Sequence, residues 1–431
     1  MQRMPSGLAQ LLSLLSLSLL GRAGPVSATI CHADTVPAAT LLLPYFEVNL
    51  GDPNGLTTLF SVNNAAAPAV LAHVAIWSDL AVPILNFNVY LTGYDVQTIN
   101  LRDVILNGRL PQTASTGQDP GDTISPRGPL SQDTNFVNCQ GLLPPPPLTA
   151  AYLSHLQRAL TGLSSPITDG LCAGQALGDN IARGYVTVDT VNNCTLRFPG
   201  DAGYFPGNGP ADVTDQNVLW GSWYIVNGRE GFAQGSDLVA IEADGTNPAT
   251  STPGRYTFYG RYVGWTAVDH REPLATTFAV HDSVGGTFSA GTSLLAWRDT
   301  KVAQAPVPCP ATPGAPVWYP LGEEGLVIFD EQEHPFELQC NPVIGGCPNP
   351  FIPFVAATQR TLVNGAALPV PFPFGWLYLD LNLGVAGTNP PADPNAAQAW
   401  VVSTESSGAH FAVAFDAFRL DSACTANHFV P

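Results

Sequence analysis

Glycine and proline interrupt this chain at short intervals along its whole length. The 431 residues include 41 glycines and 40 prolines, and both residues are unfavourable inside helices. Turn signals such as Asp52-Pro53-Asn54-Gly55 separate short apolar or alternating runs. Short runs between recurrent turns are typical of an all-β protein. We therefore expect a mainly antiparallel β fold without long helices.

The clearest strand signals lie in residues 36–106. In the run ILNFNVYLT, Leu85, Phe87 and Val89 occupy alternate positions, and this period indicates a strand with one buried face. Four further runs of the block predict strands: ATLLLPYFEV, LTTLFSVN, AVLAHVAIWS and DVQTINL. One such sheet cannot bury a face alone. We therefore expect a β-sandwich whose N-terminal module is residues 29–110.

Residues 111–183 differ in composition and are expected to form an irregular insertion rich in Pro and Gly. The four prolines of residues 144–147 predict a polyproline II segment. The run LTAAYLSHLQRALTG that follows predicts one short helix, capped by Thr149 and ended by Gly162. Strand signals return in residues 184–431, where AWVVSTE and HFAVAFDAFRL predict a hairpin. The last strands of this region are candidates to pack with the N-terminal module.

The first 28 residues have the pattern of a secretory signal peptide. Arg3 precedes an uncharged apolar run over residues 8–20, and Val26-Ser27-Ala28 fits a cleavage site. The apolar run is too short for a spanning helix, which needs about 20 residues. No second apolar segment of that length follows, so no membrane span is expected in the mature chain. We expect export to the periplasm, the cell surface or the medium.

All eight cysteines follow the predicted cleavage site: Cys31, Cys139, Cys172, Cys194, Cys309, Cys340, Cys347 and Cys424. An even number in an exported chain predicts four disulfides. Eight cysteines allow roughly 105 connectivities, and among these we favour a bond between Cys31 and Cys424 that joins the termini. No Cys-x-x-Cys occurs, so the ligand spacing of a zinc ribbon is missing.

Charge and motifs exclude several function classes. Two of the 16 basic residues, Arg3 and Arg22, precede the cleavage site, which leaves 14 basic against 34 acidic residues. Binding to nucleic acid or anionic lipid requires clustered Lys and Arg, so neither partner is expected. The sequence motifs of zincins, elbow-type serine hydrolases, P-loop proteins and dinucleotide-binding proteins do not occur.

The densest group of carboxylates lies in residues 323–337, which contain no Lys or Arg. Asp330, Glu331 and Glu333 are candidate metal ligands, because a divalent ion would relieve their mutual repulsion. Ca²⁺ suits them, since it takes roughly six to eight oxygen ligands; it is the one cofactor considered, and none is required. Two other interpretations stay open: a solvated strand end stopped by Pro335, or a pair of catalytic carboxylates.

A second candidate site lies in the run RYTFYGRYVGWTAVDHREP. If the run is a strand, alternation places four candidate ligand-binding residues on one face: Arg255, Tyr259, Arg261 and Trp265. Aromatic and Arg side chains in a row can stack on sugar rings and bind their hydroxyls. The competing interpretation is that one face of the strand is core and that its arginines pair with nearby acids.

We therefore favour an exported, non-enzymatic protein of the cell envelope or extracellular space. It would be structural, or it would bind a carbohydrate or a surface protein. The alternative hypothesis is a secreted hydrolase acting on polysaccharide. Its carboxylates would come from Asp330, Glu331 or Glu333 together with Asp269 or Glu272.

Overall fold

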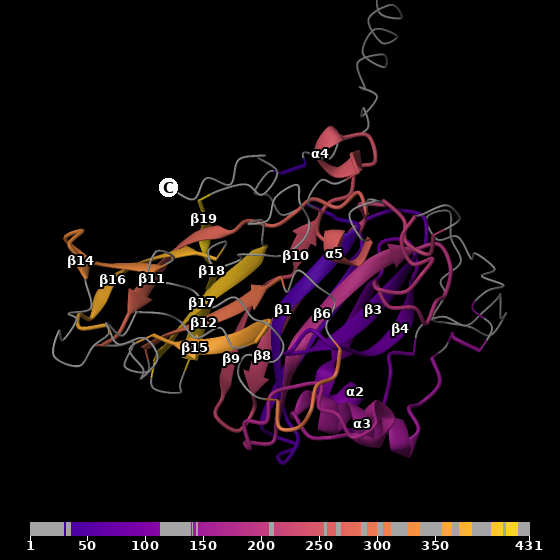
Figure 1. Ribbon diagram of the computed structural model, residues 1–431, viewed down its shortest axis with the longest axis horizontal. Coiled ribbons are helices and arrows are strands. Elements are labelled where there is room, and N and C mark those ends of the chain that lie inside the picture. The colour runs from indigo at the N-terminus through magenta and orange to yellow at the C-terminus, as the bar shows by residue number, and fades with distance from the viewer. Residues whose placement is uncertain are drawn as a thin grey trace, which may run out of the picture.

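The computed structural model is an assembly of packed antiparallel sheets (Figure 1). It describes residues 30–31, 36–112, 139, 141–143, 145–206, 211–253, 257–263, 269–285, 291–299, 305–311, 326–336, 356–363, 370–381, 398–407 and 411–420. All pairings between the described strands are antiparallel. The predicted mainly antiparallel β-sandwich fold is confirmed, whereas the predicted signal peptide lies outside the described residues.

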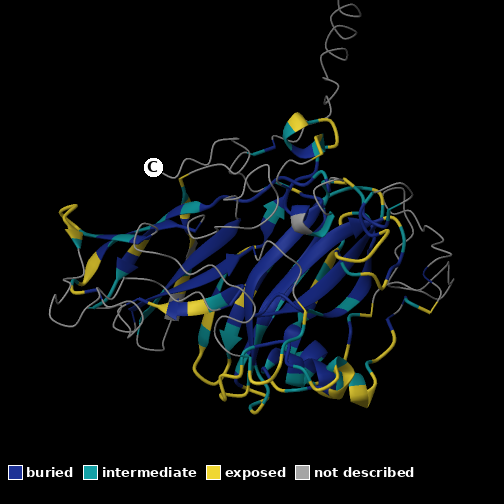
Figure 2. Ribbon diagram, viewed as in Figure 1, coloured by how far each residue is buried: buried dark blue, intermediate teal, exposed yellow. Residues whose placement is uncertain are grey.

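The first sheet combines strands from distant parts of the chain, in the order β10-β1-β6-β3-β4. These strands are β1 (Thr40–Asn49), β3 (Val70–Ser78), β4 (Pro83–Leu91), β6 (Ile181–Val191) and β10 (Val239–Ile241). β6 pairs with β1 on one side and with β3 on the other. β1 and β3 are buried along almost their whole length (Figure 2), so both faces of this sheet are covered.

The second sheet has the order β5-β2-β8-β9, with β7 pairing to the end of β2. These strands are β2 (Leu56–Asn64), β5 (Val96–Asn100), β7 (Leu219–Trp220), β8 (Ser222–Asn227) and β9 (Phe232–Asp237). Trp223 and Ile225 of β8 point into the larger hydrophobic core, whereas Tyr224 between them is exposed. This sheet therefore has the one buried face that a period of two predicts.

Two further sheets form the other end of the molecule, and their orders are β15-β12-β17-β18 and β14-β13-β16-β11-β19. The first contains β12 (Gly291–Arg298), β15 (Thr358–Leu362), β17 (Ala399–Ser407) and β18 (Phe411–Asp416). The second contains β11 (Thr277–Ser283), β13 (Leu326–Asp330), β14 (Pro335–Phe336), β16 (Phe374–Asp380) and β19 (Phe418–Arg419). The hairpin predicted near the C-terminus is confirmed, because β17 and β18 are paired.

β12 lies between two hydrophobic cores. Leu295 and Trp297 belong to the larger core, which they share with the first two sheets. Leu294 and Ala296 belong to a smaller core, which they share with β11, β13 and β16. Alternate side chains of one strand therefore enter different cores, so the sheet of β12 is a middle layer.

The described helices are short: α2 (Leu101–Ile105), α3 (Ala150–Leu160), the 3₁₀ turn η2 (Pro166–Thr168), α4 (Pro248–Ser251) and α5 (Gly260–Val263). α3 is the predicted helix. The Thr149 side chain accepts a hydrogen bond from the Tyr152 N–H at 3.2 Å, which caps it. Gly162 follows at φ +71°, where a Cβ would lie 2.1 Å from the Gln175 carbonyl carbon. Only glycine fits this conformation and contact.

Two disulfides are present among the described residues, Cys139–Cys194 and Cys172–Cys309. Cys31 is disulfide-bonded as well. Cys340, Cys347 and Cys424 lie outside the described residues. The expected pairing of Cys31 with Cys424 therefore stays a prediction.

The strand expected over residues 255–265 is wrong where the structure describes it. Gly260–Val263 is the helical turn α5, closed by hydrogen bonds from Gly260 N to Thr257 O at 3.0 Å and from Tyr262 N to Tyr259 O at 2.8 Å. The buried Asp269 carboxylate accepts a hydrogen bond from the Tyr259 N–H. That bond occupies a backbone donor that a strand ladder would have used.

Candidate functional site

The outer side of the β14-β13-β16-β11-β19 sheet carries a group of aromatic side chains. Val280 and Leu377, paired across β11 and β16, enter the smaller core. Their neighbours His281 and Trp376 are also paired, and alternation places them on the opposite side of the sheet. The same reasoning defines the aromatic face, which consists of His281, Phe329, Phe374, Trp376, Tyr378 and Phe418.

The aromatic face is open to solvent. Phe418 is 62% exposed and Phe374 is 39% exposed, while Trp376 is half-buried. The ring of His281 lies against that of Trp376, and the rings of Trp376 and Phe418 are 6.2 Å apart between centroids. A contiguous exposed aromatic surface costs solubility, so it commonly marks a binding surface.

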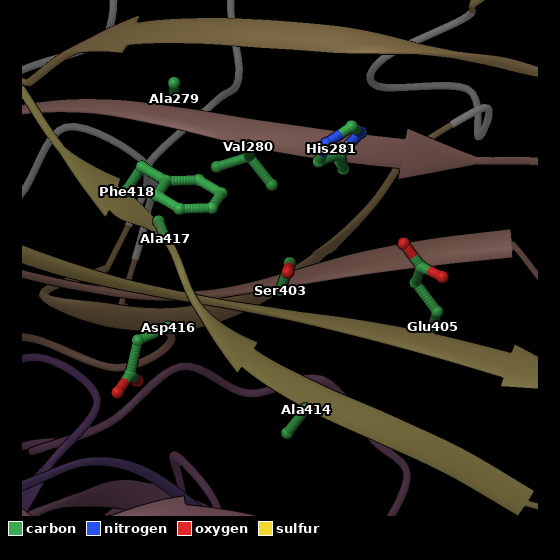
Figure 3. A pocket seen from close by; sticks show the side chains of 9 residues that line it. All are labelled: Ala279, Val280, His281, Ser403, Glu405, Ala414, Asp416, Ala417 and Phe418. Atoms are coloured by element: carbon green, nitrogen blue, oxygen red, sulfur yellow. The ribbon is translucent and has the colours of Figure 1, made fainter.

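A cavity of about 570 Å³ adjoins this face (Figure 3). Its lining residues come from β11, β17, β18 and β19: Ala279, Val280, His281, Ser403, Glu405, Ala414, Asp416, Ala417 and Phe418. In Figure 3 the Glu405 side chain rises from β17 toward β11, whereas the Asp416 carboxylate points away. The Ser236 hydroxyl of β9 lies 3.3 Å from Asp416. Glu405 is therefore the carboxylate that serves this cavity.

Glu405 shares the space between the two sheets with Asp282 of β11, whose side chain is buried at 1% exposure. Burial, reinforced by the Glu405 carboxylate, raises the pKa of Asp282 to about 6. Burial also raises the pKa of Glu405, against the opposing effects of His281 and a hydrogen bond with Ser283. Two carboxyls with raised pKa values beside a cavity are more typical of a functional site than of a structural surface.

A second cavity, of about 390 Å³, lies between β4, the proline run and α3. Its lining is Leu85, Asn86, Phe87, Asn88, Leu110, Leu142, Pro145, Pro146, Pro147, Leu148, Thr149, Tyr152, Leu196 and Phe198. None of these side chains carries a charge. This cavity therefore offers shape and apolar contact without acid, base or ion chemistry.

The structure places Tyr259, one of the four residues predicted to bind a ligand, inside the larger core. Its hydroxyl donates a hydrogen bond to Asp189 at 3.0 Å, and the Tyr204 hydroxyl donates another at 2.6 Å. Arg271 Nε lies 3.6 Å from the same carboxylate, and both side chains are almost fully buried. Tyr259 thus hydrogen-bonds a buried acid whose countercharge is Arg271.

Of the other three residues in that predicted row, Arg255 and Trp265 lie outside the described residues. Arg261 belongs to α5, and its side chain is not described. The competing interpretation, in which these arginines pair with nearby acids, therefore stays a prediction; Arg271, further along the run, lies against the distant Asp189.

Asp330, Glu331 and Glu333 lie at the tip of the β13–β14 hairpin, at an end of the molecule (Figure 1). Asp330 Oδ1 accepts hydrogen bonds from Gln332 N at 2.8 Å and from His334 N at 2.9 Å. Asp330 therefore shapes the turn, and these bonds lower its pKa. Glu331 and Glu333 are exposed. In the described part of the chain, no three His, Cys, Asp or Glu side chains are grouped as metal ligands.

The two carboxylates named as hydrolase partners are engaged elsewhere. Asp269 Oδ1 accepts a hydrogen bond from Arg271 N at 3.0 Å. Glu272 accepts from Cys31 N at 2.6 Å and from Glu242 N at 3.1 Å. Both carboxylates hold backbone N–H groups in place, a role that fits packing rather than catalysis.

Sequence reasoning missed the aromatic face and the Asp282–Glu405 pair. One signal was available: in FGWLYLD, Trp376 and Tyr378 alternate with Leu377 and Leu379, which marks one apolar and one aromatic face. The other members come from strands far apart in sequence, so only their pairing brings them together.

Comparison with known proteins gives no relative. No family model matches the chain, no curated protein matches it, and no solved structure matches it. No helix in the described residues is long and apolar enough to cross a membrane.

Proposed function

We propose that this protein is an exported, non-enzymatic carbohydrate-binding protein of the cell envelope or extracellular space. Its binding surface would be the aromatic face together with the adjoining cavity. The observation that carries the proposal is the row of His281, Trp376 and Phe418 on the outer side of one sheet, beside a cavity lined by Ser403 and Glu405.

Sugar rings have an apolar face of C–H groups and an edge of hydroxyls. The apolar face of a sugar packs against an exposed aromatic ring, because aromatic side chains bury a large apolar area on contact. The hydroxyls of a sugar need hydrogen-bond acceptors and donors, which Ser403 and Glu405 supply at the cavity. Charge narrows the class of ligand. Because the chain carries a net charge of −18, a neutral polysaccharide is favoured over an anionic one.

Export rests on the predicted signal peptide and is supported by the disulfides. Cys139–Cys194 and Cys172–Cys309 are bonds that persist in oxidising compartments. Polysaccharides are present in the cell envelope and the extracellular space. The expected location is therefore compatible with the proposed ligand.

The test is a pull-down series of the mature protein on insoluble neutral and anionic polysaccharides, followed by affinity electrophoresis on those that retain it. We expect retention by a neutral polysaccharide and at least tenfold weaker binding by the Trp376→Ala and Phe418→Ala variants, about 1.4 kcal/mol. Reducing-sugar assays on the same polymers should show no release.

Tyr94→Ala is the matched control, because Tyr94 is an exposed aromatic residue at 58% exposure in the turn between β4 and β5. It should bind as the wild type does. Failure of every polysaccharide to retain the protein would remove the proposal, and so would equal binding by the Trp376 and Tyr94 variants.

A further inference from the structure

Two carboxylates from different sheets meet at one end of the smaller core. Phe278 and Val280 of β11 belong to that core, so Asp282, two residues further, points into the same space between the sheets. Ala399 and Val401 of β17 also belong to it, and the same alternation directs Glu405 there. The Glu405 carboxylate also acts electrostatically on the Asp282 carboxyl, which agrees with this placement from strand alternation.

Asp282 has no partner that would explain its burial. Its side chain is 1% exposed, and neither carboxylate oxygen has a hydrogen-bond partner. Within the described chain the only charged group acting on this carboxyl is Glu405, which has the same sign. An unpaired buried charge is costly, and proteins usually compensate it with an ion pair or a metal.

Other oxygens surround the pair. Thr292 of β12 lies directly across from Glu405 in the strand register. The Thr292 hydroxyl accepts a hydrogen bond from Ser283 N at 2.9 Å and donates to the Ser283 carbonyl at 3.2 Å. Ser283 also hydrogen-bonds Glu405 through its side chain. Carboxylates, a hydroxyl and a main-chain carbonyl are the oxygen donors that calcium accepts.

We propose that Asp282 and Glu405 bind a divalent cation of the calcium type between the two C-terminal sheets. The hydroxyl of Thr292, the carbonyl of Ser283 and water would complete the oxygen shell, since calcium tolerates irregular shells of roughly six to eight ligands. The ion would join β11 to β17 across the sandwich. This inference shares Glu405 with the proposed carbohydrate binding, but calcium binding and thermal stability test it without any carbohydrate.

A catalytic role for the pair is less well supported by the same geometry. Asp282 does not line the cavity and is nearly inaccessible, so a polysaccharide could not reach it. A bare ion is small enough to enter where a sugar is not. The predicted metal ligands Asp330, Glu331 and Glu333 form a separate set on an exposed hairpin. Substitutions in that set therefore serve as the control for substitutions of Asp282 and Glu405.

The test measures calcium binding and thermal stability on the mature protein after EDTA treatment and dialysis at neutral pH. Titration calorimetry with CaCl₂ should show one site, and about 1 mM Ca²⁺ should raise Tm by at least ~2 °C. Asp282→Asn and Glu405→Gln should each weaken binding at least tenfold and abolish the Tm rise. Glu331→Gln/Glu333→Gln should respond to calcium as the wild type does.

A folding defect is separable from loss of the ion. Removal of one buried charge relieves repulsion, so the calcium-free Asp282→Asn variant should melt no lower than the calcium-free wild type. No calcium response in the wild type would overturn the proposal. An undiminished response in Asp282→Asn and Glu405→Gln would also overturn it, and loss of the response only in the Glu331/Glu333 variant would assign the ion to the hairpin.

Discussion

A buried carboxyl at Asp79 gives the clearest pH-dependent prediction. Its side chain is 3% exposed, in the loop that follows β3. The carboxylate accepts a hydrogen bond from Gln175 N at 3.1 Å, and its own carbonyl accepts one from Ala357 N at 2.7 Å. Asp79 thus joins the segment after α3 to the start of β15, in the larger core.

Burial raises the pKa of Asp79 from 3.8 to about 7. At 1.36 kcal/mol per unit, a shift of about three units corresponds to ~4 kcal/mol. Because the folded-state pKa is raised, the folded protein holds the proton more tightly than the unfolded chain. Below about pH 4 Asp79 costs no free energy of unfolding, because the carboxyl is protonated in both states. The loss of stability grows as pH rises toward 7 and is complete above about pH 7.

Asp79→Asn should remove this penalty, since an amide keeps the acceptor for Gln175 N and carries no charge. Urea unfolding at pH 5 and pH 8.5 should show the variant gaining stability relative to wild type, by up to ~4 kcal/mol at the higher pH. Asp179→Asn is the control, and its difference from wild type should be the same at pH 5 and pH 8.5. Hydrogen bonding to Arg183 lowers the pKa of Asp179 from 3.8, so the contribution of that residue to stability is complete at both pH values and is lost only below about pH 4. An unchanged difference between Asp79→Asn and wild type at the two pH values would refute the reasoning.

Three further substitutions test the scaffold by urea unfolding. Thr149→Ala should cost about 1 kcal/mol, because the cap of α3 is lost; no change would mean that the cap is redundant. Replacing Cys139 and Cys194 by Ser opens a loop of 55 residues and should cost about 4 kcal/mol, while equal stability would show that packing alone holds that loop. Arg271→Met strands the buried Asp189 charge and should cost about 3–5 kcal/mol, which Asp189→Asn in the same chain should partly restore.

Local patterns predicted the elements well. The five strands of residues 36–106, the helix with its Thr149 cap and the C-terminal hairpin are all present. They were readable because alternation, caps and turns depend on neighbours in sequence. The same local reasoning failed at Tyr259, where the deciding partners are Asp189 and Asp269, which bring tertiary contacts to a strand-like sequence.

The candidate site could not be predicted from local sequence patterns, because its residues are brought together only by tertiary structure. Trp376, His281 and Phe418 belong to three strands, and their order in the sheet is a property of the topology. Glu405 and Asp282 are separated by more than a hundred positions and carry no motif. The acidic residues around Asp330 were conspicuous because they are close together in sequence. A single exposed turn can carry such a local group of charges without forming a site.

The position of β6 between β1 and β3 governs how the chain can be made. β1 is synthesised early, yet its hydrogen-bonding partners β6 and β10 are translated well over a hundred residues later. Until then an apolar strand has two open edges, each able to recruit another chain. A chain that crosses a membrane from its N-terminus would meet this hazard on the far side. We therefore expect the first sheet to close only when the chain up to residue 241 is present.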